Sequence, residues 1–156
     1  MSHFLFIVIA IIAILGLGMI KEHFREKMIR TWVAEQGGIF HWPFVEAQHK
    51  DLPAKQLTCR FETQGAHQWA AGIEHEAHGK AVWLIEYSAT PAGHSTGRWH
   101  CLVAERCTHA DEAQRLCRDR SMATSHEWVC AGDWVAIRHI GLISSTLLAE
   151  LSARTR

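Results

Sequence analysis

The sequence predicts an α+β protein: an N-terminal transmembrane helix, then a small domain in which helices pack on one side of an antiparallel sheet. Three observations lead to this class. Residues 4–20 contain no charged side chain. Segments that are apolar or alternate between apolar and polar residues follow one another across short, turn-rich connections, which favours antiparallel pairing of neighbours. Segments with helical periodicity precede, interrupt and follow these strands.

The apolar run at residues 4–20 predicts a membrane anchor. Its 17 residues would span roughly 26 Å as a helix, inside the range of transmembrane segments. A cleaved signal peptide needs a basic region before the run and small residues after it. Here only Ser2 and His3 separate the run from Met1, and Lys21-Glu22-His23 follows it. We therefore expect residues 1–20 to be a retained anchor.

The charges beside the anchor predict its orientation. Four cations follow the run within ten residues, whereas no Lys or Arg precedes it: Lys21, Arg25, Lys27 and Arg30. Cations near a span stay on the cytoplasmic side, so we expect the N-terminus outside and the domain in the cytoplasm. The five cysteines, an odd number without a tight pairing pattern, suit a reducing compartment.

Residues 21–38 are predicted to extend the anchor helix into the cytoplasm. An apolar stripe recurs every four residues, and Gly37-Gly38 can end the helix. The stripe consists of Ile20, Phe24, Met28 and Trp32. Two interpretations stay open: the stripe packs on the following domain, or it binds a membrane surface or a partner.

Residues 39–156 are predicted to form one cytoplasmic domain. A short extended segment at 39–44 ends near Pro43, residues 45–56 are polar and irregular, and 57–62 is a further strand. Three clearer strands follow at 67–74, 81–87 and 99–105. Gly79 stands where the hairpin between the first two requires a positive φ angle.

The last third of the chain predicts a helix, a hairpin and a second helix. Residues 108–120 have acidic residues at the start, basic residues at the end and Thr108 as a cap, as the helix dipole prefers. Strands at 127–131 and 134–140 flank Gly132-Asp133. A helix beginning at Ser144 or Ser145 then presents three leucines on one face, Leu147, Leu148 and Leu151.

The block GIEHEAHGKAVWLIEYSATPAGHSTGRWHCLVAER resembles part of a group of short single-pass bacterial membrane proteins of unknown function. In that group a strand ending in an acidic residue and Tyr, here Glu86-Tyr87, belongs to a cytoplasmic β-meander that follows a membrane helix. The hairpin WVCAGDWVAIRHIG and the terminal helix are similar too. The resemblance implies the bacterial inner membrane and this topology, and it implies no active site.

Catalytic and metal-binding patterns fail on spacing. His75-Glu76-Ala77-His78 has one residue too few between its histidines for a zinc-protease motif, which places them four positions apart. The possible ligands Cys101, Cys107, His109 and Cys117 include no close pair of the kind that closed zinc sites use. No nucleophile elbow or phosphate loop is present. Sixteen basic and sixteen acidic residues disfavour nucleic acid. We therefore expect no enzyme, no cofactor and no metal site.

The seven tryptophans suit either an aromatic core under the sheet or exposed contacts with another protein. Three of them, Trp69, Trp83 and Trp99, fall one on each clear strand, and Trp83 and Leu84 are both expected to be covered. Gly16 and Gly18 mark where another membrane helix can approach, although glycine is common in such helices anyway.

The leading hypothesis is a non-catalytic accessory or scaffold subunit of a larger membrane complex. Its partners would be the lipid bilayer and other integral membrane subunits, and a photosynthetic or respiratory assembly is one host of this kind. The candidate partner-binding residues are Gly16, Gly18, Phe24, Met28, Trp32 and Trp42. One alternative is a membrane-tethered module that senses a ligand or metal through its His- and Cys-rich side. A second is a membrane-tethered enzyme with an unrecognised site.

Overall fold

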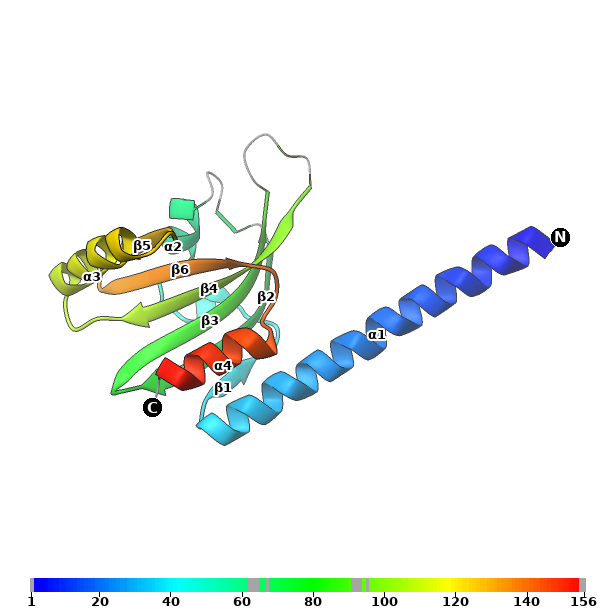
Figure 1. Cartoon of the computed structure of the whole chain (residues 1–156), viewed down its shortest axis with the longest axis horizontal. Coiled ribbons are helices and arrows are strands. Elements are labelled where there is room, and N and C mark those ends of the chain that lie inside the picture. The colour runs from blue at the N-terminus through cyan, green and yellow to red at the C-terminus, as the bar shows by residue number, and fades with distance from the viewer. Residues whose placement is uncertain (1, 62–64, 67, 91–93, 95, 155–156) are drawn as a thin grey trace.

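The computed structural model describes residues 2–61, 65–66, 68–90, 94 and 96–154, and it confirms the α+β class (Figure 1). The elements are, in order, α1 (Ser2–Gln36), β1 (Ile39–His41), the short 3₁₀ helix η1 (Glu46–Gln48), α2 (Ala54–Phe61), β2 (Gln68–Ala77), β3 (Lys80–Ala89), β4 (Arg98–Arg106), α3 (Ala110–Ala123), β5 (Trp128–Ala131), β6 (Trp134–Ile140) and α4 (Ser145–Arg154).

The six strands form one antiparallel sheet in the order β1-β2-β3-β4-β6-β5. The three clear strands of the sequence are β2, β3 and β4, and they form the predicted meander. Gly79 has the positive φ angle expected of it, 72°, at the β2–β3 turn. The strand predicted at 134–140 agrees with β6 residue for residue.

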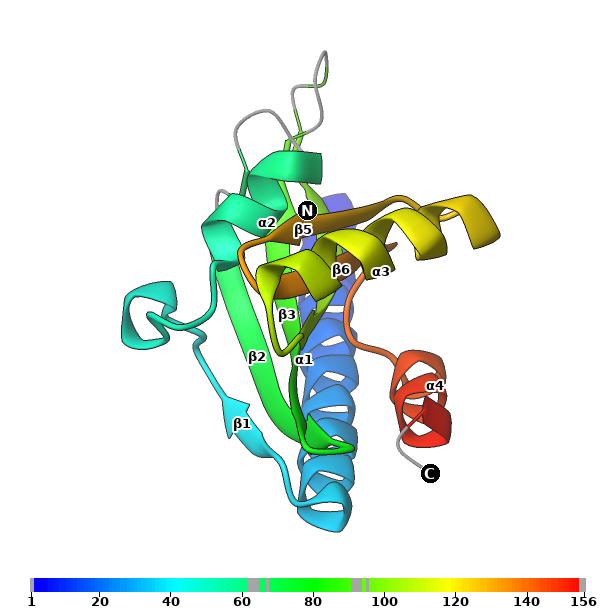
Figure 2. The same cartoon turned by 90° about the vertical axis from the view of Figure 1, so that its left-hand side faces the viewer.

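Helices cover both faces of the sheet, so the prediction of helices on one side is wrong. Strand β3 is buried along almost its whole length. Its even-numbered Leu84 packs with Ile29 of α1 and Leu148 of α4, whereas its odd-numbered Ile85 packs with Leu57 of α2. In Figure 2, α1 runs behind the strands while α2 lies in front of them. Because the side chains on both faces of β3 are buried, helices must pack against both faces of the sheet.

The strand predicted at 57–62 is a further error, because residues 57–61 belong to α2, while residue 62 lies outside the described residues. Ala54, Leu57 and Thr58 are the buried residues of α2. Their spacing of three and four residues places them on one helical face, and a short apolar segment of this kind is ambiguous between the two periods. The Leu57 N–H donates to the Pro53 carbonyl oxygen in the first turn (2.9 Å).

The start of α3 also differs from the prediction in detail. His109, and not Thr108, occupies the N-cap position, and its side chain makes no capping hydrogen bond. The backbone N–H of Thr108 instead donates to the Glu112 carboxylate (2.8 Å). A carboxylate from within the helix thus supplies the acceptor at this end.

Helix α1 joins the predicted anchor and its extension without a break. It is long and apolar enough to cross a membrane, and its most apolar window is not buried at all. Figure 1 shows its N-terminal half projecting well beyond the sheet. The C-terminal half packs on the domain through Ile29 and Val33, which are buried. The packed residues therefore lie one position beyond the predicted stripe.

Candidate functional site

Three residues of the predicted stripe of α1 line an open groove between α1 and α4. The groove has a volume of about 530 Å³. Its apolar lining comes from both helices: Phe24, Met28, Trp32, Leu148 and Ala149. Phe24 is 65% exposed, while Met28 and Trp32 are partly buried against the core. Three of the predicted partner-binding residues therefore come together on one surface.

Trp32 anchors the floor of this groove to the domain. Its indole N–H donates to the Ser152 hydroxyl of α4 (2.9 Å), and its ring meets the His75 ring edge-on, with the ring centroids 5.5 Å apart. Both contacts hold one edge of the ring against the domain. Part of the ring remains available in the groove, where an aromatic residue with a satisfied polar atom suits a binding surface.

The charged residues Lys27 and Glu35 also line this groove. A groove with an apolar floor and a few charges of both signs resembles the surfaces that accept an apolar helix from a partner. Six residues of α1 border it, all between Phe24 and Glu35, so it begins one turn beyond the predicted span. These twelve residues of helix measure about 18 Å. The groove therefore follows the axis of the anchor.

A buried ion pair fixes α1 to the sheet next to the groove. Arg25 donates to the carboxylate of Glu86, which is fully buried on β3, and also pairs with Glu22. The backbone N–H of Ile143 donates to the same Glu86 oxygen, Oε1 (2.7 Å). Burial raises the pKa of Glu86, while the Ile143 N–H and Arg25 oppose that rise. Glu86 thus connects α1, β3 and the segment before α4.

The remaining predicted partner-binding residues lie elsewhere on α1 and after β1. Gly16 and Gly18 lie on the projecting half of α1, and a Cβ atom added at either one would meet nothing within 4 Å. Trp42 is 45% exposed, and the guanidinium carbon of Arg25 lies 5.8 Å from its ring centroid. Trp42 is therefore close to the ion pair but outside the groove.

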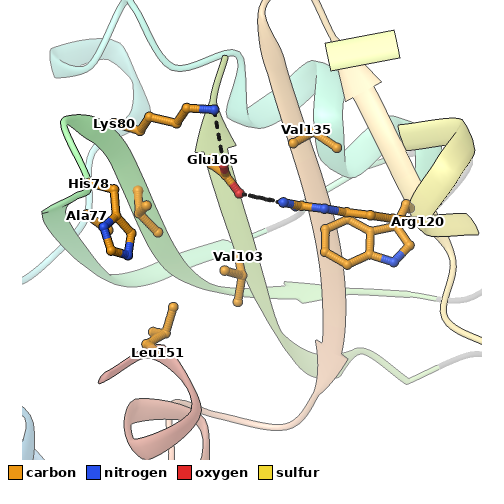
Figure 3. Close-up of a pocket in the computed structure, with 10 residues that line it drawn as sticks. Ala77, His78, Lys80, Val103, Glu105, Arg120, Val135 and Leu151 are labelled. Atoms are coloured by element: carbon orange, nitrogen blue, oxygen red, sulfur yellow. Dashed lines mark hydrogen bonds and ion pairs between the residues drawn. The ribbon is translucent and has the colours of Figure 1, made fainter. Parts of the chain in front are cut away.

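A second hollow, of about 550 Å³, lies on the same face of the sheet as α4 and is bordered by Leu151 of that helix (Figure 3). Lys80, Glu105 and Arg120 line it and pair with one another: Glu105 lies 3.7 Å from Lys80 and 3.1 Å from Arg120. Arg120 also stacks its guanidinium over Trp128. Glu112 of α3, outside the hollow, also pairs with Lys80 (3.2 Å). Each cation of the hollow therefore has a carboxylate partner, which favours a structural role.

The His- and Cys-rich residues are dispersed over the domain. Cys101 is in the core under α1 and α4, whereas Cys107 and Cys117 pack near α3. Burial raises the pKa of all three thiols, so they are poorer nucleophiles than an exposed cysteine. Within the described ranges, no group of three or more His, Cys, Asp or Glu side chains is arranged to hold a metal ion.

A histidine pair packs among the core aromatics and was not predicted. The rings of His41 and His49 lie 4.5 Å apart, and both contact Trp83. Phe44 stacks on His49. Burial lowers the pKa of His49, with a smaller effect of His41 in the same direction. No sequence motif links these residues. They meet only because the irregular segment after β1 folds back over the sheet, and local sequence patterns do not predict that path.

No protein-family model, curated protein or solved structure matches this chain. The resemblance to short single-pass bacterial membrane proteins therefore stays a prediction from the residues quoted above.

Proposed function

We propose that this chain is a non-catalytic, single-pass membrane protein that serves as an accessory or scaffold subunit of a larger membrane complex. The observation that carries the proposal is the apolar groove of α1 and α4, which begins one turn beyond the anchor. Its occupant would be an apolar helix of an integral membrane partner. Such a helix, on leaving the bilayer beside the anchor, meets the groove without crossing open water.

Retention of the anchor is supported by the continuity of α1. The helix that carries the apolar run also supplies Ile29 and Val33 to the domain core and Arg25 to the buried ion pair. Removal of the N-terminal part as a signal peptide would cut close to these contacts. The positive flank favours a cytoplasmic domain with the N-terminus outside, in the inner membrane of a bacterium.

Two extractions test the proposal. In mild detergent, an accessory subunit migrates as part of a complex much larger than its own 17.7 kDa. A chain that migrates alone and carries stoichiometric metal or a coloured cofactor would favour the sensing module instead. Harsh extraction at alkaline pH should leave the chain in the membrane fraction, and its release would overturn the anchor.

A swap of residues 4–20 for polyleucine asks whether the span takes part in docking. Because Gly16 and Gly18 have open space around them in this chain, larger residues there cannot disturb its own packing. If the span docks, the swapped protein stays in the membrane and separates from its complex. Unchanged recovery of the same partners at the same ratio would assign docking to the cytoplasmic part, where Trp32 and Trp42 would be examined next.

A further inference from the structure

An exposed apolar patch lies on the end of the domain nearest the anchor. It comprises Trp42 (45% exposed), Trp99 (37%), Ile140 (81%) and Leu142 (37%). None of the four belongs to the α1–α4 groove or to the second hollow. Trp42 lies on the β1 side of the sheet, and Trp99, Ile140 and Leu142 lie on the side of β4 and β6. Exposed apolar residues that share one end of a small domain mark a protein or membrane contact.

Contacts with α1 fix the height of this patch above the membrane. On one side, β1 runs back along α1 towards the anchor: Arg30 lies over the Phe40 ring and Arg25 lies near the Trp42 ring. The step from Arg30 to Arg25 is about 7.5 Å of helix, and the two-residue step from Phe40 to Trp42 covers about 7 Å of strand. Trp42 is therefore level with Arg25.

On the other side, the segment after β6 is fixed at the same level. The Glu86 carboxylate pairs with Arg25 and accepts the N–H of Ile143, so the preceding Ile140 and Leu142 lie close to the Arg25 level. The Gly141 N–H donates to the Trp99 carbonyl oxygen (2.8 Å), which holds Trp99 beside them. In Figure 1 the arrow of β6 points towards the side from which the anchor half of α1 emerges.

Arg25 is five residues beyond Ile20, the last residue of the apolar run, a rise of about 7.5 Å along the helix. The headgroup layer on each side of a bilayer is about 5–7 Å thick. Residues level with Arg25 therefore lie at the outer edge of that layer, and their large side chains reach into it. Tryptophan is the residue that membrane proteins favour at this depth.

We infer that Trp42, Trp99, Ile140 and Leu142 form a lipid-contacting surface, by which the domain rests on the membrane. The inference rests on the anchor of the proposed function, and it assigns the bilayer itself, rather than a protein, as the occupant of this patch. Lys21, the first residue after the apolar run, and Arg98, next to Trp99 in the sequence, are both exposed, and basic side chains suit anionic headgroups. The ion pair of Arg25 then sets the angle between the domain and the anchor.

Photo-crosslinking of the full chain tests this surface. Benzoylphenylalanine replaces Ile140 in one variant and Met122 in a control, because both residues are 81% exposed and Met122 lies on α3, away from the anchor. Each variant is reconstituted into vesicles of phosphatidylethanolamine and phosphatidylglycerol and irradiated. We expect a lipid adduct at position 140 in several-fold excess over position 122, as measured by mass spectrometry.

The outcomes separate this inference from the proposed function. If the chain withstands alkaline washing but position 140 yields no more lipid adduct than position 122, the lipid-contacting surface is wrong and the anchor stands. A protein adduct in place of a lipid adduct at position 140 in native membranes would likewise overturn it. If the chain leaves the membrane on washing, both the anchor and the lipid-contacting surface are overturned.

Discussion

Arg25 of α1 and Glu86 of β3 are 61 residues apart in the chain and form an ion pair whose carboxylate is fully shielded from solvent. The pair joins α1, the helix that carries the apolar run of residues 4–20, to a central strand of the sheet. It also positions Ile143, whose N–H donates to the same carboxylate oxygen. The relation between anchor and domain therefore depends on two side chains that no local sequence pattern connects.

Replacement of Arg25 by Met should destabilise the domain by about 3–5 kcal/mol, because it leaves the Glu86 carboxylate buried without its cation. The free energy of unfolding is measured by urea denaturation of the detergent-solubilised chain. The double variant Arg25→Met/Glu86→Leu should recover part of this loss. Arg30→Met, which removes an exposed pair with Glu26 on the same helix, should cost less than about 1 kcal/mol. Equal losses at positions 25 and 30 would contradict a structural role for the buried pair.

The elements that the sequence predicted well are those with strong local signals. Strands β2, β3, β4 and β6 follow from apolar runs bounded by turn residues, and Gly79 follows from hairpin geometry. Helix α2 was misread because its eight residues are too few for the period to be decisive. The sequence did not predict that helices pack on both faces of the sheet. A run such as AVWLIEY is nearly continuously apolar, and its pattern alone does not show which elements pack on each face.

The groove was predicted only in part. Phe24, Met28 and Trp32 follow from the four-residue periodicity of the chain after the anchor. The other wall comes from α4, more than a hundred residues later, and the packing of α4 on the sheet decides whether the stripe is covered or open. From the sequence, a covered stripe and an open stripe were both possible. In the structure Ile29 and Val33 take the core positions, and Phe24 remains exposed.

Trp83 should be essential for stability. Both Trp83 (5% exposed) and Leu84 are buried, as predicted, and the Trp83 ring contacts those of His41, Phe44 and His49. Trp83→Ala should cost about 3–5 kcal/mol, a large share of the roughly 5–15 kcal/mol that stabilises a typical domain. The cellular level of the variant should fall accordingly. Trp42→Ala is the control and should leave the level near wild type, whereas a normal level of the Trp83→Ala variant would refute the predicted cost.

His75 should make the domain less stable in mild acid. It is buried against Trp32, and burial lowers its pKa while Glu76 opposes this. The folded state therefore resists a proton that the unfolded chain accepts below about pH 6.5. Stability from this residue is complete above that pH and is lost as the pH falls towards the lowered pKa.

The measurement compares the urea midpoints of wild type and His75→Phe between about pH 7.5 and about pH 5, the range of histidine titration. The variant keeps a ring against Trp32 and should lose less stability on acidification. His49, whose pKa is also lowered, contributes equally to both proteins and cancels in the difference. Parallel pH profiles would exclude His75 as the source.

Cys59 provides the test of orientation. It is exposed, whereas Cys101 and Cys107 are buried and would resist any reagent on either side of the membrane. A membrane-impermeant maleimide should leave Cys59 unlabelled in intact cells and label it after the cells are opened. A reporter fused after Arg156 should be active in the cytoplasm. Labelling of Cys59 in intact cells would reverse the predicted orientation.

The central claim, that the α1–α4 groove holds a helix of a membrane partner, is tested most directly by one pull-down from native membranes. Wild type, Phe24→Glu and the control Met122→Glu carry the same tag; Phe24 lies in the groove, and Met122 is an exposed residue of α3. We expect wild type and Met122→Glu to recover the same partner at the same ratio, while Phe24→Glu remains in the membrane and recovers little of it. Recovery of the partner by Phe24→Glu at the wild-type ratio would contradict the claim, as would a wild-type chain that is isolated alone.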